Sequence, residues 1–118
     1  MVNQVVLVGR LTKNLEVKEL EDGNSVCNLT LAVPRSYKNA KGEYDTDFIE
    51  CVLWDTIAKN TAEYCKKGDI VGIKGRLQTD NFEKESGEKV YKLNVMAEKV
   101  TFLSSRNQDE KEHDDMER

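Results

Sequence analysis

Apolar and polar residues alternate along most of the first 103 positions, which is the pattern of half-buried β-strands. In one stretch Ile49, Cys51 and Leu53 share an aliphatic face that suits a core. The opposite face carries Phe48 and Trp54, the latter being the sole tryptophan. Four residues at roughly 3.3 Å each place the two rings about 13 Å apart. Such rings are either a second packing surface or a platform on which bases stack.

The same alternation predicts further strands, separated by turn signals. The turn Asp22-Gly23-Asn24 joins two of them, and Pro34 is expected to end the second, because proline cannot donate to a ladder. A longer polar hairpin turns near Ser86-Gly87 and carries one exposed-looking aromatic residue, Phe82. The predicted strands are 2–11, 15–20, 26–33, 48–54, 70–77 and 90–103.

The polar segment 35–45 holds two tyrosines, Tyr37 and Tyr44, among basic residues. A loop that exposes aromatic rings beside cations has something to bind, or the segment folds as a hairpin whose tyrosines cover the sheet. Composition leaves both alternatives open.

One segment, 55–67, has the apolar spacing of a helix. Asp55 or Thr56 can cap its start, cations in its last turn suit the helix dipole, and Gly68 can supply the C-terminal cap. Without the short segment 15–20 the pattern gives five full strands with one helix between the third and the fourth, which describes an all-β OB-fold. This fold is a five-stranded Greek-key barrel, here with long β-hairpin loops.

The composition narrows the class of protein. The chain has 118 residues, 38% of them hydrophobic and 34% charged, which is enough for one self-supporting core. No apolar run approaches the ~20 residues that span a bilayer, and the N-terminus has no secretory pattern, so a cytoplasmic location is expected. Cys27, Cys51 and Cys65 form no CxxC pair and are predicted to be buried free thiols. The single histidine, His113, lies in a charged segment, which argues against a His-based catalytic or metal site.

Charge is divided unevenly along the chain. Residues 104–118 contain six acidic and three basic side chains, which leaves −1 of the total −4 for residues 1–103. A near-neutral body lacks the footprint of duplex-DNA readers but suits single-strand binders, which draw part of their affinity from stacking. The predicted organisation is an OB-fold domain over 1–103 and a disordered acidic tail over 104–118.

Four segments carry a family resemblance: VNQVVLVGRL (2–11), NLTLAV (28–33), EYCKKG (63–68) and GRLQT (75–79). In this order they closely resemble bacterial single-stranded DNA-binding protein, and the resemblance runs from Met1 to about Leu103. It implies non-catalytic, sequence-independent binding of single-stranded DNA in replication, recombination, repair or DNA uptake. It also implies a homotetramer and no cofactor or metal.

In that family, aromatic side chains on the sheet face and in the hairpins stack on unpaired bases, while cations follow the phosphates. The resemblance assigns stacking to Tyr37, Phe48, Trp54 and Phe82. Phosphate contacts are expected first from Arg10, Arg35 and Lys38, and less so from Lys41 and Arg76. The remaining aromatic residues of interest are assigned to packing: Tyr44, Tyr64, Tyr91 and Phe102.

Three carboxylates depart from the family pattern. Asp80 stands where arginine is common, Glu50 lies between Phe48 and Trp54, and Asp55 follows Trp54 directly. A carboxylate near the path of the phosphates opposes binding and removes a counterion-release contact. We therefore expect weaker and less salt-dependent binding than a basic relative shows.

The C-terminal residues EHDDMER lack the Pro-Phe tip with which family members dock replication and repair enzymes. Replication or recombination proteins remain candidate partners, without that docking tip. The short form resembles an accessory paralogue, of the kind linked to natural transformation or mobile elements, or a truncated chain.

Two other functions stay open from the residues alone. The acids at positions 50, 55 and 80 would suit an OB-fold protein-interaction module with weak or lost DNA binding. A metal-dependent nuclease ranks third, because Asp45, Asp47 and Glu50 imitate a metal cluster. Strand alternation separates these acids, which fall on different faces of the strand or in the loop before it. No His or Lys completes a catalytic site beside them, so no enzyme activity is predicted.

Overall fold

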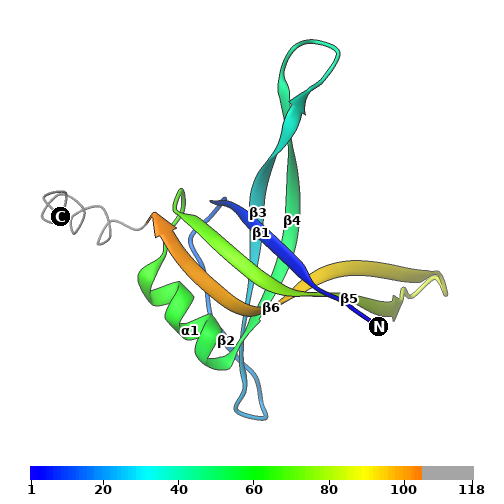
Figure 1. Cartoon of the computed structure of the whole chain (residues 1–118). Coiled ribbons are helices and arrows are strands. Elements are labelled where there is room, and N and C mark those ends of the chain that lie inside the picture. The colour runs from blue at the N-terminus through cyan, green and yellow to red at the C-terminus, as the bar shows by residue number, and fades with distance from the viewer. Residues whose placement is uncertain (105–118) are drawn as a thin grey trace, which may run out of the picture.

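β-strands make up most of the computed structural model, which describes residues 1–104. The elements in chain order are β1 (Val5–Leu11), β2 (Lys18–Glu19), β3 (Ser25–Lys38), β4 (Tyr44–Trp54), α1 (Asp55–Tyr64), β5 (Ile70–Glu83) and β6 (Lys89–Ser104), as Figure 1 shows. The predicted tail covers 104–118. Ser104 is the last residue of β6 and residues 105–118 lie outside the described part, so the tail and the domain boundary stay predictions.

The strands close into a barrel. The sheet order is β1-β5-β6-β4-β3-β2. β1 also pairs with β3, and this pairing joins the first and the last of the five long strands and closes the sheet. All neighbouring pairs are antiparallel except β4 and β6, which run parallel where Cys51 and Val52 meet Val95 and Met96. With α1 between β4 and β5, this is the predicted OB-fold, and the prediction is confirmed.

The inward positions of the alternating strands form the core. Cys51 and Leu53 are buried and Ile49 is partly buried against them, so the predicted core face of β4 is correct. The backbones of β1 and β3 approach so closely at Gly9 that no side chain fits there, because a Cβ on Gly9 would lie 2.5 Å from the carbonyl oxygen of Ala32. The core residues below 3% exposure are Leu11, Cys27, Leu29, Leu31, Cys51, Leu53, Ala58, Val71, Ile73 and Val95.

The three cysteines are free and buried, as predicted. Burial raises the pKa of the Cys51 thiol to about 12 and, with help from nearby Asp69, that of Cys65 to about 11. Burial is also the main reason why the pKa of Cys27 is raised. All three therefore behave as small apolar groups at neutral pH.

The helix is shorter than predicted. It ends at Tyr64, and the N–H groups of the next residues find acceptors elsewhere: Lys66 donates to Asp69 Oδ2 (3.0 Å) and Lys67 to Asn14 Oδ1 (2.8 Å). These side-chain acceptors replace the carbonyls that a further helical turn would supply. The predicted N-terminal cap, Asp55 or Thr56, is also wrong, because Trp54 holds the N-cap position and no side chain caps this end of the helix.

Pro34 does not end its strand. β3 continues to Lys38, and Pro34 lies opposite Thr46 in β4, with the register shifting between Pro34 and Lys38. β1 pairs with β3 only at Leu31 and Ala32, so the strand beyond has β4 as its single neighbour. On such a two-stranded ribbon the missing N–H of proline can face the free edge.

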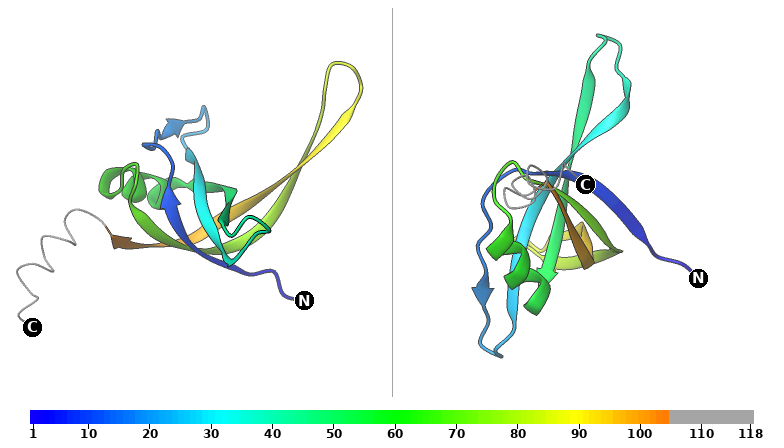
Figure 2. Two further views of the ribbon diagram at one scale, coloured as in Figure 1. Left: turned by 90° about the horizontal axis from the view of Figure 1, so that it is seen from above. Right: turned by 60° about the vertical axis from the view of Figure 1, so that its left-hand side comes forward.

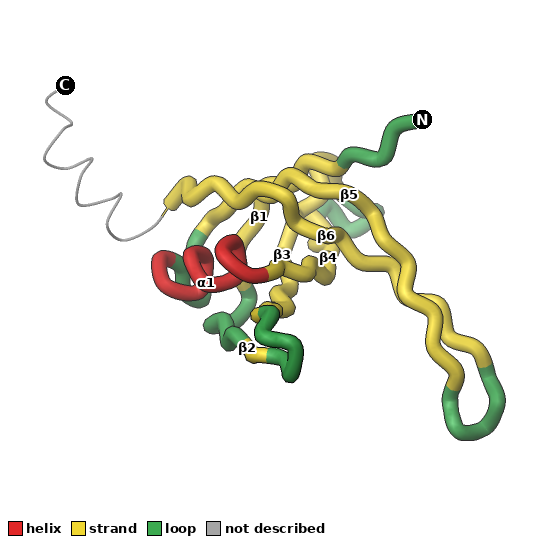
Figure 3. The backbone as a smooth tube through the Cα atoms, turned by 90° about the horizontal axis from the view of Figure 1, so that it is seen from below, coloured by secondary structure: helices red, strands yellow, loops and turns green. Residues whose placement is uncertain are grey.

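Two hairpin arms leave the barrel. We call residues 34–46 the β3–β4 arm and residues 78–94 the β5–β6 arm, and Figure 2 shows them pointing in different directions. The segment 35–45 is thus a hairpin, but Tyr37 and Tyr44 are exposed and do not cover the sheet. In Figures 1 and 3, α1 lies on the opposite side of the barrel from the β5–β6 arm.

The packing assignments of the other aromatic residues are partly correct. Phe102 packs against the core and contacts Tyr64, with ring centroids 5.9 Å apart, although Tyr64 is itself 51% exposed. Tyr44 and Tyr91 are exposed, Tyr91 by 68%, so packing is wrong for these two within a single chain. Among residues 1–104, no helix is long and apolar enough to cross a membrane.

Candidate nucleic-acid interface

A groove runs between the outer face of the barrel and the β5–β6 arm. Its outer-face side chains come from β3, β4 and the arm, and Lys13 in the loop after β1 also lines it. The lining residues that the argument uses are Lys13, Glu50, Trp54, Asp80, Phe82, Lys92 and Asn94.

Strand alternation explains why these side chains meet. In β4, Glu50 and Trp54 point away from the core because Cys51 and Leu53 point into it. In the arm, Asp80 lies opposite Lys92 and Phe82 opposite Val90, and directly opposed residues of antiparallel strands share a face. The groove is therefore built by two neighbouring surfaces that are far apart in the sequence.

The structure brings two of the four predicted aromatic residues together. Trp54 is partly buried in the groove, and Phe82 faces it with 50% exposure. Phe48 is 66% exposed on the same outer face of β4, opposite Ala32, but beyond the groove. Tyr37 is 64% exposed on the β3–β4 arm. None of the four rings belongs to the core cluster, so packing within the barrel does not account for them.

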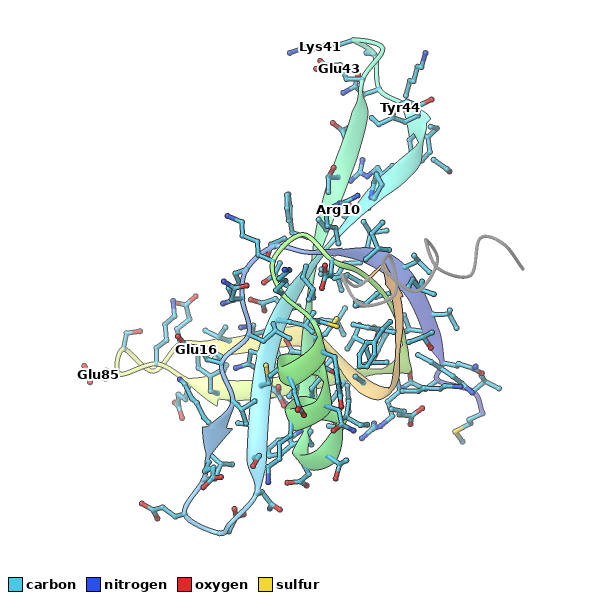
Figure 4. All side chains as sticks on the ribbon, turned by 90° about the vertical axis from the view of Figure 1, so that its left-hand side faces the viewer. Arg10, Glu16, Lys41, Glu43, Tyr44 and Glu85 are labelled. Carbon is cyan, nitrogen blue, oxygen red and sulfur yellow. The ribbon has the colours of Figure 1, made fainter. Side chains whose placement is uncertain are left out.

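The predicted cations lie outside the groove. Arg10 pairs with Ala32, which in turn pairs with Phe48, so the three cross the outer face in one row. The Arg10 guanidinium donates from Nη1 to the carbonyl oxygen of Gly68 (2.7 Å). Figure 4 shows Arg10 near the base of the β3–β4 arm and Lys41, Glu43 and Tyr44 at its tip.

The remaining two cations are engaged on the β3–β4 arm. Arg35 donates to Asp47 from Nε and Nη2, at 3.0 to 3.3 Å, and lies 3.8 Å from Asp45. This hydrogen-bonded ion pair raises the pKa of Arg35 and lowers that of Asp47. Lys38 places its Nζ 5.9 Å from the centroid of the Tyr44 ring, which is cation–π distance.

Two cations that sequence reasoning missed do line the groove, Lys13 and Lys92. A signal for Lys92 was present, because a hairpin turning near Ser86-Gly87 sets Lys92 opposite Asp80 and on the face of Phe82. No such signal exists for Lys13, which lies in a loop whose path depends on the tertiary structure.

Each of the three departing carboxylates has a partner. Glu50 Oε2 forms an ion pair with Lys92 Nζ at 2.9 Å, and Asp80 Oδ2 accepts a hydrogen bond from Asn94 Nδ2 at 2.8 Å. Asp55 lies outside the groove lining and accepts from the backbone N–H of Ser25 at 2.9 Å. Glu50 and Asp80 thus stand in the groove, whereas Asp55 joins β3 to the start of α1.

The groove can hold an unpaired nucleic-acid strand by simple means. Aromatic rings offer faces on which bases stack, lysines can contact phosphates, and Asn94 offers a polar amide. Within the described residues no group of three or more His, Cys, Asp or Glu side chains could hold a metal ion. Of the acids that imitate a nuclease cluster, Asp45 and Asp47 contact Arg35 on the arm while Glu50 lies in the groove.

A closed five-stranded barrel with exposed aromatic rings along an open groove defines an OB-fold protein of the oligonucleotide-binding type. The model of the Single-strand binding protein family matches residues 2–103. The chain belongs to this family, and the resemblance seen in the sequence is confirmed.

Named relatives agree with this assignment. The chain is 48% identical to single-stranded DNA-binding protein B of Bacillus subtilis over 106 residues, covering 90% of this chain and 94% of that protein. It is 49% identical to a single-stranded DNA-binding protein of Bacillus cereus, covering 91% of this chain and 63% of that protein. It is 46% identical to single-stranded DNA-binding protein 3 of Streptococcus agalactiae, covering 91% of this chain and 78% of that protein. The chain therefore spans nearly all of one relative and just under two thirds of another.

Proposed function

We propose that the protein binds single-stranded DNA without sequence preference and without catalysis. The observation that carries the proposal is the meeting of Trp54 and Phe82 in one open groove, from elements that are distant in sequence. Membership of the single-strand binding protein family supports it. The relatives that are named single-stranded DNA-binding proteins point to the same ligand.

Base stacking supplies the affinity in this proposal. Each stacked base is worth about 1–3 kcal/mol and any base can stack, so binding is insensitive to sequence. Trp54 and Phe82 form the centre of the binding path. Phe48 extends it along β4, and Tyr37 extends it onto the β3–β4 arm.

Phosphate contacts come from cations beside this path. Lys13 and Lys92 line the groove itself, and Arg10 lies in one row with Phe48. Arg35 and Lys38 are available only after exchanging their partners on the arm. With a net charge of about −1 over residues 1–103, binding is weaker and less salt-dependent than for a basic relative.

The biological setting follows from the ligand. We propose roles in replication, recombination, repair or DNA uptake, at a cytoplasmic, nucleoid-associated location where single-stranded DNA occurs. A homotetramer is proposed as well, supported by exposed apolar side chains such as Val6, Tyr91 and Leu93, which a partner copy would cover. Sedimentation at micromolar protein that returned only the 13.5 kDa monomer would contradict the tetramer.

A fluorescence titration tests DNA binding directly. Trp54 is the sole tryptophan, so stacking of a base on its ring should quench the protein's tryptophan emission. Adding poly(dT) at low salt should lower the emission to a plateau, and added salt should restore it. If micromolar protein at low salt shows no change in emission and no shift of a labelled oligo(dT), the proposal is wrong. An OB-fold interaction module without DNA binding is then the better interpretation.

A further inference from the structure

An ion pair lines the groove. Lys92 Nζ on the β5–β6 arm lies 2.9 Å from Glu50 Oε2 on β4, and both side chains are about half exposed, 51% and 50%. Trp54 and Phe82 border the same groove. A cation that shares the groove with both rings is thus already neutralised by a carboxylate of the same chain.

We propose that Glu50 competes with DNA phosphate for Lys92, so that the groove weakens its own hold on DNA by a built-in counterion. This inference rests on the proposed function and deepens it. A DNA phosphate that contacts Lys92 must either displace Glu50 or share the ammonium group with it, and in both cases a carboxylate stands beside the phosphate. The expected gain from one lysine contact is therefore largely cancelled.

Glu50, and not Asp80, is the competitor that the geometry identifies. Asp80 lies opposite Lys92 in the strand register, but its Oδ2 accepts from the Asn94 amide at 2.8 Å. Glu50 is the acid that contacts the ammonium group, at 2.9 Å. An exposed ion pair of this kind is weak, so a phosphate can exchange with it.

A purely structural role for the pair would have the opposite consequence. Glu50 and Lys92 also bridge the barrel and the β5–β6 arm, so the pair could act as a tether that keeps Phe82 facing Trp54. The arm is already held by the uninterrupted antiparallel ladder of β5 and β6 from Gly75 to Glu83 and by the parallel contact of β4 with β6 at Cys51 and Val52. A tether role predicts that loss of Glu50 weakens DNA binding, whereas competition predicts that it strengthens binding.

The test measures oligo(dT) binding by anisotropy of a labelled strand, over a range of salt concentrations. Glu50→Gln keeps the size of the side chain and removes its charge. It should lower the Kd about 3- to 10-fold at low salt and steepen the slope of log K against log salt by about 0.7. Glu98→Gln is the matched control, because Glu98 is an exposed acid on β6 that lines the cleft against α1 instead of the groove. It should change the Kd by less than about 2-fold, because solvent screens distant charges.

A double-mutant cycle shows whether Lys92 is the group that is released. In a Lys92→Gln background, adding Glu50→Gln should leave the salt slope unchanged, because no lysine is freed. An equal steepening in both backgrounds would overturn the proposal in favour of a long-range charge effect. Weaker binding by Glu50→Gln would overturn it in favour of the tether. Equal thermal unfolding midpoints of the four proteins would show that the differences arise in binding.

The two proposals can fail separately. If the wild-type protein binds oligo(dT) and Glu50→Gln does not tighten binding, only the competition is wrong. If neither protein binds, single-strand binding itself is wrong and the competition falls with it.

Discussion

The β3–β4 arm and the groove both combine aromatic rings, cations and carboxylates, but they are assembled differently. On the arm, Arg35 contacts Asp47 and Lys38 contacts Tyr44, all within one exposed two-stranded ribbon. In the groove, Trp54 comes from the barrel and Phe82 from the other arm. Arg35 and Lys38 thus find partners near the arm itself, whereas the groove is a hollow lined by rings from two separate elements. Similar residue types thus produce one self-contained ribbon and one surface suited to a ligand.

The sharpest test of this difference removes one ring at a time. Trp54→Ala and Phe82→Ala should each cost about 1–3 kcal/mol of binding free energy, because each loses a stacking face in the groove. Tyr37→Ala should cost less, because its ring is 64% exposed on the arm and does not line the groove. Anisotropy of labelled oligo(dT) measures all three variants.

Thermal unfolding provides the control for the ring variants. A variant that melts earlier but binds normally would show that its ring supports the fold and does not stack. If Tyr37→Ala lost as much binding free energy as Trp54→Ala, the β3–β4 arm and the groove would contribute equally to DNA binding, and the proposed difference between them would be wrong.

A second pair of variants compares charge reversal in the two regions. Asp80→Arg should tighten oligo(dT) binding and steepen the salt slope by about one unit, because it adds a cation in the groove. Asp45→Arg makes the same charge change on the β3–β4 arm and should steepen the slope less. Salt titrations of both variants test this, and an unchanged slope for Asp80→Arg would place Asp80 away from the DNA path.

The smallest expected effect concerns the local pairing on the arm. Because Arg35 lowers the pKa of Asp47, the carboxyl should titrate below its ordinary value of 3.8. The stabilisation from this pair is present above the unfolded pKa of the carboxyl and is lost as pH falls through the lowered folded value. Carboxyl NMR shifts of Asp47 report the titration. In Arg35→Ala the midpoint should return toward 3.8, and an unchanged midpoint would show that the pair does not persist in solution.

Local backbone geometry made much of the fold predictable. Alternation in β4 correctly separated Cys51 and Leu53 from Phe48 and Trp54, because side chains of a pleated strand must point to opposite faces. The turn near Ser86-Gly87 likewise follows from glycine chemistry, since Gly87 adopts a φ of +87°. The predicted free and buried state of the cysteines also holds.

The errors arose where a neighbour from elsewhere in the chain intervened. The end of α1 depends on Asp69 and Asn14, which accept from backbone N–H groups that a longer helix would have used. The continuation of β3 past Pro34 depends on the absence of β1 beside that part of the strand. Neither circumstance can be read from the local pattern.

By itself, the sequence determined the strands, their inward faces, the family and the four candidate rings. Only the tertiary structure decided which rings share a groove and which cations line it with them. The opposition of Lys92 and Asp80 follows from hairpin symmetry, but the contact of Lys92 with Glu50 requires β4 and β6 to meet in parallel across the closed barrel. Alternation is a property of each strand alone, whereas that meeting depends on closure of the whole sheet, and closure brings together residues that are 42 positions apart in the chain.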